Sequence, residues 1–169
     1  LLAGAQRPDR GSIRFQGREI AGRPAHVVSR LGIARTFQKL RPFTGMTVLE
    51  NVMVSSLIRE RDHKAARDRA QECIEFVGLT HKRDALADTL STGQRKRLEF
   101  ARAIACKPAV YLLDEVMAGI DHRSLGELVD LVRRLRDGGA TIVMIEHNLP
   151  VLGELCERLA DHSPTTMWV

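Results

Sequence analysis

The strongest constraint on the fold comes from two continuous apolar runs that flank one amphipathic helix. The runs, "AVYLLD" at 109–114 and "ATIVMIE" at 140–146, show none of the alternation of a half-exposed strand. The segment between them, 124–139, has helical periodicity and ends at Gly138-Gly139. Its apolar face consists of Leu125, Leu128, Val129, Val132 and Leu135. Because such strands are buried on both faces, and a helical connection makes their pairing parallel, the sequence predicts an α/β fold with a mainly parallel sheet core.

Ionisable residues stand at the ends of both apolar runs. Asp114 and Glu115 close the first run, and His147 follows the second. One interpretation is a pair of strands that end in solvent, where acidic residues are common. The other is a magnesium and water site for phosphate chemistry, in which a metal compensates the charge of Asp114 and Glu115 orients the attacking water. Ligands of parallel sheets bind at the carboxyl ends of the strands, so the convergence of these residues favours the second interpretation.

A serine-capped helix supplies a second candidate site. In "LSTGQ", residues 90–94, Ser91 is a good N-cap and Gly93 lies in the first turn of the helix. The free N–H groups and the dipole of a helix start attract anions, although a plain N-cap with a flexible glycine explains the same residues. Four basic residues follow, and they form either a solvated helix face or a surface for phosphates or an acidic partner: Arg95, Lys96, Arg97 and Arg102.

The first half of the chain predicts shorter elements. They are a last helical turn and a turn over 1–11, a strand or hairpin over 11–20, a short helix over 23–32, a strand over 33–38 and a helix over 63–79. Gly32 and Gly78 end the two helices. Thr47 and Glu50 match a capping box, which predicts a further helix from about Val48.

Composition excludes several classes of function. The 169 residues suit a single domain, and the net charge of +5 weakly favours an anionic partner. Aromatic residues make up 4%, so base-stacking platforms for nucleic acid are not expected. Cys73, Cys106 and Cys156 lie far apart without metal-ligand spacing, which indicates reduced thiols in a cytosolic setting. No apolar run reaches the roughly 18 residues of a membrane span and no signal peptide starts at Leu1, so we expect a partner to carry any membrane role.

Five segments, in this order, resemble the motifs of one family. They are "TFQ" at 36–38, "LSTGQRKRLEFARAI" at 90–104, "VYLLDE" at 110–115, "AGID" at 118–121 and "IEH" at 145–147. Together they resemble the ATP-binding subunits of ABC transporters, which implies a P-loop NTPase-like ABC ATPase domain. By this resemblance the chain, 1–169, is a single partial ABC ATPase domain, incomplete at both ends. Residues from about 40 to 90 would form an inserted helical subdomain, and the remainder a RecA-like core.

The resemblance also implies roles for individual residues. Glu115 would polarise the attacking water, and His147 would be the switch histidine. Asp114, together with Gln38 of the Q-loop, would assist Mg²⁺, and Asp121 would lie in the D-loop. The signature, which meets the γ-phosphate of a nucleotide bound on the opposite subunit, would consist of Ser91, Thr92, Gly93 and Gln94.

A function and a set of partners follow from the same resemblance. The protein would be an ABC-type ATPase that uses ATP and Mg²⁺ and acts with transmembrane permease subunits and a second ATP-binding subunit, identical or different, and with no nucleic acid. It would be cytoplasmic and peripheral on the inner face of the cell membrane. Residues 32–54, "GIARTFQKLRPFTGMTVLENVMV", are most similar to the branched-chain amino acid importers, which implies import of these or similar small solutes. The alternatives are a non-transport ABC ATPase of DNA repair or translation and a non-catalytic fragment.

The sequence departs from the family pattern in several places. None of the 13 glycines precedes a lysine, so the G-x-x-x-x-G-K-[ST] loop that cradles phosphates is missing. Leu1 resembles the middle of the helix after that loop, which implies a chain truncated before it and inactive alone. Thr92 stands where a glycine is common, and Val116 and Met117 replace a usual proline and small residue. The last residues, 160–169, lack the apolar strand expected there.

Overall fold

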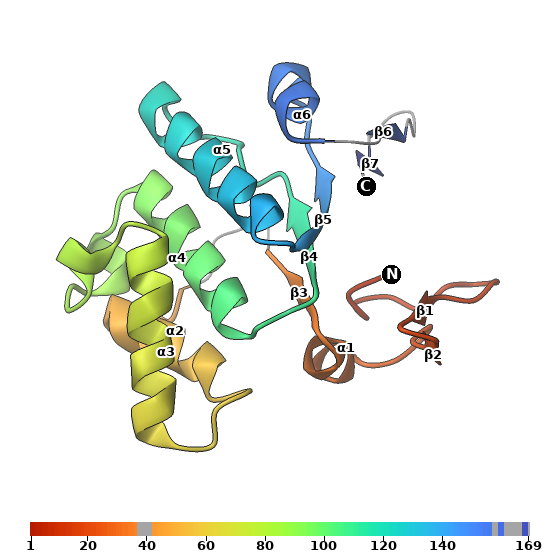
Figure 1. Cartoon of the computed structure of the whole chain (residues 1–169), viewed down its shortest axis with the longest axis horizontal. Helices are drawn as coiled ribbons and strands as arrows, with labels where there is room; N and C mark the ends of the chain where they lie inside the picture. Colours follow the sequence, from red (N-terminus) through yellow and green to blue (C-terminus); the bar gives the residue numbers. More distant parts are fainter. Residues whose placement is uncertain (37–41, 157–158, 161–166, 169) are drawn as a thin grey trace.

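The central sheet contains the parallel strands that the sequence predicts. The computed structural model describes residues 1–36, 42–156, 159–160 and 167–168. In this part of the chain the main sheet has the order β3-β4-β5-β7-β6. Its strands are β3 (Ile33–Arg35), β4 (Val110–Asp114), β5 (Thr141–Ile145), β6 (Leu159–Ala160) and β7 (Met167–Trp168). β4 pairs in parallel with both β3 and β5, so the carboxyl ends of these strands lie at one edge of the sheet (Figure 1).

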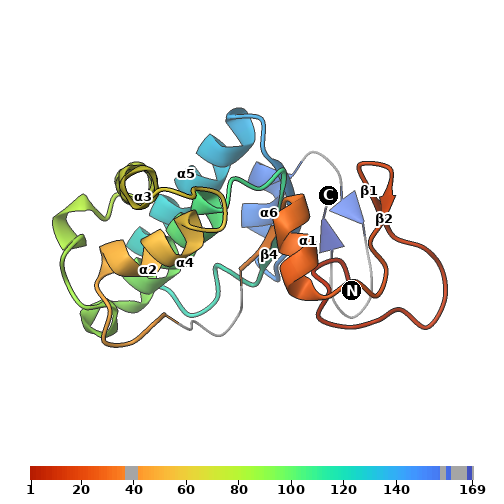
Figure 2. The same ribbon diagram turned by 90° about the horizontal axis from the view of Figure 1, so that it is seen from below.

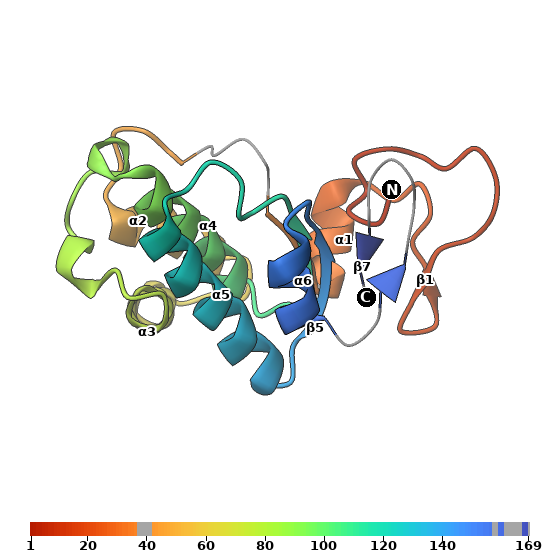
Figure 3. The same cartoon turned by 90° about the horizontal axis from the view of Figure 1, so that it is seen from above.

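Helices cover both faces of this sheet. They are α1 (Ala25–Leu31), α2 (Val48–Ser56), α3 (His63–Phe76), α4 (Thr92–Ala105), α5 (His122–Asp137) and α6 (Leu149–Leu155), with short 3₁₀ turns η1 (Thr80–Lys82) and η2 (Ala87–Thr89). Figures 2 and 3 show α1 on one side of the parallel strands and α4 with α5 on the other. Within the described residues, no helix has both the length and the apolar character needed to cross a membrane.

Alternate residues of β4 enter two hydrophobic clusters. Tyr111 and Leu113 pack into the larger cluster, which α4 and α5 also line. Val110 and Leu112 pack against the smaller cluster on the other face. That smaller cluster consists of Ile20, Val28 and Ile33. Successive strand residues point to opposite faces, so burial of both faces requires the continuous apolar run seen in the sequence.

A group of helices lies beside the sheet. α2 and α3 pack on each other and on α4, on the side of the molecule opposite the hairpin of β1 (Arg14–Phe15) and β2 (Arg18–Glu19) (Figure 1). The buried residues of α3 recur at helical spacing and form one face of the helix: Ala66, Ala70, Cys73 and Ile74. α4 is therefore shared between the helical group and the layer that covers the sheet.

The start of α2 confirms the predicted capping box. Thr47 Oγ1 accepts the Glu50 N–H at 3.2 Å, and the Glu50 carboxylate accepts the Thr47 N–H at 2.7 Å. The hydrogen bond from the Thr47 N–H lowers the pKa of Glu50, because it favours the ionised form. Since the folded pKa lies below the unfolded one, this carboxylate stabilises the fold above the unfolded pKa, and the contribution is lost as the pH falls through the folded pKa.

Replacing Thr47 by alanine should lower the free energy of unfolding by about 1 kcal/mol, because the Glu50 N–H loses its acceptor. Thr47→Ser keeps the hydroxyl and should stay within about 0.5 kcal/mol of the wild type. Urea denaturation at neutral pH measures both differences. Equal stability of the alanine and serine variants would contradict the contribution of this cap.

The hairpin predicted around Gly17 is also confirmed. β1 and β2 pair antiparallel, and the register opposes Phe15 to Arg18 across a two-residue turn. Both turn residues, Gln16 and Gly17, have positive φ angles of 48° and 76°. These angles suit the type I′ turn that matches the twist of a hairpin.

Two expectations at the ends of the chain are wrong. Residues 2–6 form turns and bends instead of a last helical turn, because Gly4 has a φ of 69°, outside the range of a right-handed helix. β7 lies within 160–169, where the sequence predicts no strand, and pairs antiparallel with β5. Backbone N–H and C=O groups at a sheet edge can pair with any extended segment, so this pairing needs no apolar pattern.

Candidate functional site

The ends of β4 and β5 bring two ionisable side chains together. Glu115 follows β4, and its N–H donates to the Ile145 carbonyl at 2.9 Å, which ties the two strand ends. Glu115 has a φ of 47°, so the chain turns sharply there. The Glu115 carboxylate then meets His147, with 3.1 Å between Oε1 and Nε2. Positive φ outside glycine is costly and concentrates at functional sites, so this turn marks the sheet edge as a candidate site.

Asp114, the last residue of β4, is held by a residue that the sequence analysis did not select. Arg35 Nη2 lies 2.8 Å from Asp114 Oδ2, and both side chains are partly buried. Arg35 is the last residue of β3, opposite Leu112 in the register. The predicted strand over 33–38 therefore ends at Arg35, and Gln38 lies outside the described residues. No signal for this pair is present in the sequence, because the predicted strand extends to Gln38 and the register of β3 on β4 is not visible in the apolar pattern.

The first turn of α4 is closed by its own side chains. Ser91 Oγ accepts the Gln94 N–H at 3.3 Å, and Gln94 Oε1 accepts the Ser91 N–H at 3.0 Å. This is a capping box, so the interpretation as an N-cap is correct. Ser91 and Thr92 remain exposed at the helix start. The positive end of the α4 dipole thus faces solvent beside an exposed hydroxyl, an arrangement that can receive an anion.

Gly93 brings the start of α4 against the start of α5. A Cβ on Gly93 would lie 2.5 Å from Ser124 Oγ and 2.8 Å from Ser124 Cβ. Ser124 in turn donates to Asp121, which caps α5 through bonds of 2.9 Å to the Ser124 N–H and 2.8 Å to its hydroxyl. The backbone bond from Ser124 lowers the pKa of Asp121. The structure therefore joins the proposed signature and D-loop segments within one chain through Ser124, which the sequence analysis missed.

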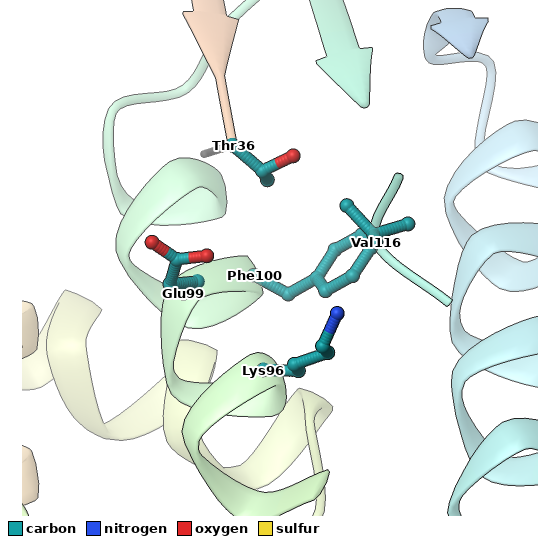
Figure 4. A pocket seen from close by; sticks show the side chains of 5 residues that line it. All are labelled: Thr36, Lys96, Glu99, Phe100 and Val116. Atoms are coloured by element: carbon teal, nitrogen blue, oxygen red, sulfur yellow. The ribbon is translucent and has the colours of Figure 1, made fainter. Parts of the chain in front are cut away.

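One basic residue of α4 is not on a solvated face. Lys96 is only 6% exposed, so of the two alternatives the solvated helix face is wrong for this residue. It has helical spacing to Phe100, which is also buried, and this spacing could have placed Lys96 on the inner face. Lys96 lines a small pocket between α4, the end of β3 and the turn after β4 (Figure 4). The other lining residues are Thr36, Glu99, Phe100 and Val116.

Solved structures with the same fold are ATP-binding cassettes. The ADP conformation of MJ1267, an ATP-binding cassette of an ABC transporter, matches with a TM-score of 0.79 at 28% identity, over 91% of this chain and 66% of that one. CbiO1 from Clostridium perfringens matches with a TM-score of 0.81 over 92% of this chain and 63% of that one. Its 24% identity supports the fold alone. The predicted class, a P-loop NTPase-like ABC ATPase domain with a mainly parallel sheet, is confirmed.

The sequence comparisons show the family. The family model described as "ABC transporter" matches residues 1–118, so this chain belongs to the ABC transporter family. The lipopolysaccharide export ATP-binding protein LptB of Haemophilus influenzae is 35% identical over 94% of this chain and 66% of its own length. The branched-chain amino acid transport ATP-binding protein BraF of Pseudomonas aeruginosa is 34% identical over 95% of this chain and 68% of its own length. The chain thus spans about two thirds of the length of these relatives.

Proposed function

We propose that this chain is the ATP-binding and ATP-hydrolysing part of an ABC transporter. The observation that carries the proposal is the 3.1 Å contact between Glu115 Oε1 and His147 Nε2, at the sheet edge where β4 also ends in Asp114. A carboxylate fixed beside an imidazole at this edge is suited to orient a water for attack on a phosphoryl group. Membership of the ABC transporter family supports this chemistry.

The catalytic roles in this proposal belong to Glu115 and His147. Glu115 accepts a proton from the attacking water as the water oxygen bonds to the γ-phosphorus. The bond from that phosphorus to the β-γ bridging oxygen breaks at the same time, and ADP leaves. The contact with His147 restricts the rotation of the Glu115 carboxylate, which keeps the water aligned. The tie between the Glu115 N–H and the Ile145 carbonyl fixes the backbone below the same carboxylate. Both side chains therefore act from the ends of paired strands that a hydrogen bond joins.

The residues present fit Mg²⁺ shared with a nucleotide. Mg²⁺ in phosphate sites is bound through one or two carboxylates, with substrate phosphates and water as the other ligands. In the described part of the chain no three His, Cys, Asp or Glu side chains gather as a metal cage. Asp114 would hold the ion, and Gln38 is proposed as its second protein ligand. The bound ion would neutralise charge on the phosphates.

The signature residues are proposed to act on a nucleotide bound by a second ATP-binding subunit, identical or different. Ser91 and Thr92 are exposed at the positive end of α4, which supports contact with a γ-phosphate from outside the chain. Gly93 and Gln94 complete this proposed contact. Asp121 would form the D-loop at the same interface, since Ser124 packs Gly93 against the start of α5.

We assign residues from about 40 to 90 to a helical subdomain that meets the permease, and the remainder to a RecA-like core. The packing of α2 and α3 on α4 supports this division. The end of α2 and the two residues after it expose three apolar side chains, Val54, Leu57 and Ile58, which suits a protein partner. The subunit would then sit in the cytoplasm, peripheral on the inner face of the membrane that holds the permease.

The proposed cargo is a branched-chain amino acid or a similar small solute, taken up by the cell. Residues 32–54 and the 34% identity to BraF support import. LivG of Salmonella typhimurium, named as a branched-chain amino acid transport protein, is 33% identical over 94% of this chain. The 35% identity to LptB favours lipopolysaccharide export as a second candidate. Reconstitution with the permease of each system, followed by transport of the labelled cargo, separates the two.

ATP hydrolysis tests the proposal directly. The 169 residues contain no G-x-x-x-x-G-K-[ST] motif, so the assay uses the chain with a phosphate-binding loop supplied ahead of Leu1. We expect Mg²⁺-dependent release of phosphate that stops when EDTA removes the metal. Residues 1–169 without the loop serve as the control and should not bind MgATP at micromolar concentration. No turnover from the loop-bearing chain, with permease present, would contradict the proposed function.

A further inference from the structure

Two buried charges lie behind the turn that carries Glu115. Lys96 of α4 is 6% exposed, and Glu146, which follows β5, is 3% exposed. Burying an ionised group costs free energy unless charges and hydrogen bonds compensate it. Buried ion pairs are weak contributors to stability, because apolar residues of similar volume often do as well. Their presence at this place therefore calls for a role other than stability.

Each of the two charges holds the main chain of the same turn. Lys96 Nζ donates a hydrogen bond to the Glu115 carbonyl at 3.4 Å. Glu146 Oε1 accepts the Met117 N–H at 2.7 Å. The Ala118 N–H also donates to the Glu115 carbonyl, at 3.2 Å. The first and third residues of the turn are thus fixed from two different elements, α4 on one side and the end of β5 on the other.

This turn needs such support because its backbone is strained. Glu115 has a φ of 47°, which costs of the order of 1–3 kcal/mol outside glycine unless the surroundings enforce it. In this backbone conformation the Glu115 carboxylate meets His147 at 3.1 Å. Figure 4 shows the Lys96 side chain reaching from α4 toward Val116, the middle residue of the turn.

The charges of the two residues complement each other across the turn. Burial lowers the pKa of Lys96, while the carboxylates of Glu146, Glu99 and Glu115 favour its charged form. Burial raises the pKa of Glu146, and the Met117 N–H and the Lys96 charge oppose that rise. Each charge thus reduces the cost of burying the other, so removal of one leaves the other buried without its compensation.

We propose that Lys96 and Glu146 are positioning residues that clamp the turn from Glu115 to Met117 and so hold the Glu115 carboxylate against His147. This inference rests on the proposed function only for the role of Glu115. The clamp itself is a property of the 169-residue chain. It links α4, whose first turn carries the proposed signature, to the proposed catalytic carboxylate.

The test measures the turn without nucleotide. In residues 1–169 labelled for NMR, the Met117 amide reports the bond to Glu146, and the His147 ring resonances report the contact with Glu115. We expect Glu146→Ala to speed exchange of the Met117 amide by at least about tenfold, whereas Glu146→Gln, which keeps an acceptor oxygen, should retain most of the protection. Lys96→Met should shift the His147 ring resonances in the direction seen in Glu115→Gln, and Lys96→Arg should restore the wild-type position.

A control separates positioning from general destabilisation. Ile74→Ala removes a buried side chain of α3 and weakens the fold, but it should leave the His147 ring resonances in place. The proposal is overturned if Lys96→Met and Glu146→Ala leave both probes unchanged, or if Ile74→Ala changes them equally. Should Lys96→Met fail to fold, the comparison of Glu146→Ala with Glu146→Gln decides alone. None of these readouts needs ATP turnover, so failure of the clamp and failure of the proposed ATPase are separate results.

Discussion

A Glu115→Gln variant is expected to retain bound ATP and to hydrolyse it roughly 10²- to 10⁴-fold more slowly than the wild type, the range that a positioned general base contributes. Glutamine keeps the shape of the side chain and a hydrogen-bonding group for His147, so the turn after β4 should survive. It cannot accept a proton from water, so only the chemical step is affected. The loop-bearing chain described above is used for this assay.

Two measurements decide this first prediction. Nucleotide affinity by titration should be unchanged or tighter, while phosphate release should fall. Glu75→Gln is the matched control, because Glu75 is an exposed glutamate of α3, and its turnover should equal that of the wild type. Wild-type turnover in Glu115→Gln would remove this residue from the catalytic role and leave the contact with His147 as a structural one.

A Gly93→Ala variant is expected to lose about 1–3 kcal/mol of unfolding free energy, the usual cost of overpacking. The added Cβ would lie 2.5 Å from Ser124 Oγ and 2.8 Å from Ser124 Cβ. Rotation of the hydroxyl relieves only the first contact, and it breaks the 2.8 Å bond to Asp121. Alanine in a helix normally gains up to about 1 kcal/mol over glycine, and we expect the steric cost to exceed that gain.

A double-mutant cycle and a second glycine test the cause of this loss. Ser124→Gly removes both clashing atoms, so Gly93→Ala should cost much less in the Ser124→Gly background. Gly126 of α5 is the control, because a Cβ there would meet no atom within 4 Å. Gly126→Ala should therefore be neutral or stabilising. Thermal denaturation of the wild type, the two single variants and the double variant gives the coupling free energy between residues 93 and 124. A Gly93→Ala variant as stable as Gly126→Ala would exclude the steric explanation.

The parallel core could be predicted from the sequence because its physical requirement is visible along the chain. A strand that is buried on both faces needs an uninterrupted run of apolar residues, and β4 and β5 each show such a run. The proximity of Glu115 and His147 follows from the same reasoning, since the carboxyl ends of neighbouring parallel strands share an edge. The capping box at Thr47 and the N-cap at Ser91 could also be predicted, because each is contained in four consecutive residues.

The rest of the site depends on relations between distant residues. The ion pair of Arg35 with Asp114 requires the register of β3 on β4, which apolar patterning does not specify. Lys96 is buried because two other elements bring the Glu115 carbonyl and Glu146 to it, while its own neighbours in sequence are basic and suggest a solvated face. β7 has two residues and pairs with β5 through its main chain, so its side chains form no pattern from which a strand could be predicted.

The close approach of Gly93 to Ser124 has a consequence for communication between sites. With no room for a side chain between them, the beginning of α4 cannot move closer to the beginning of α5 without displacing Ser124. A movement of the first turn of α4 toward α5 would also shift Ser124, whose N–H and hydroxyl donate to Asp121 at the start of α5. A ligand that moved α4 in this direction would therefore shift the start of α5 through a single steric contact, with no rearrangement of the apolar interior.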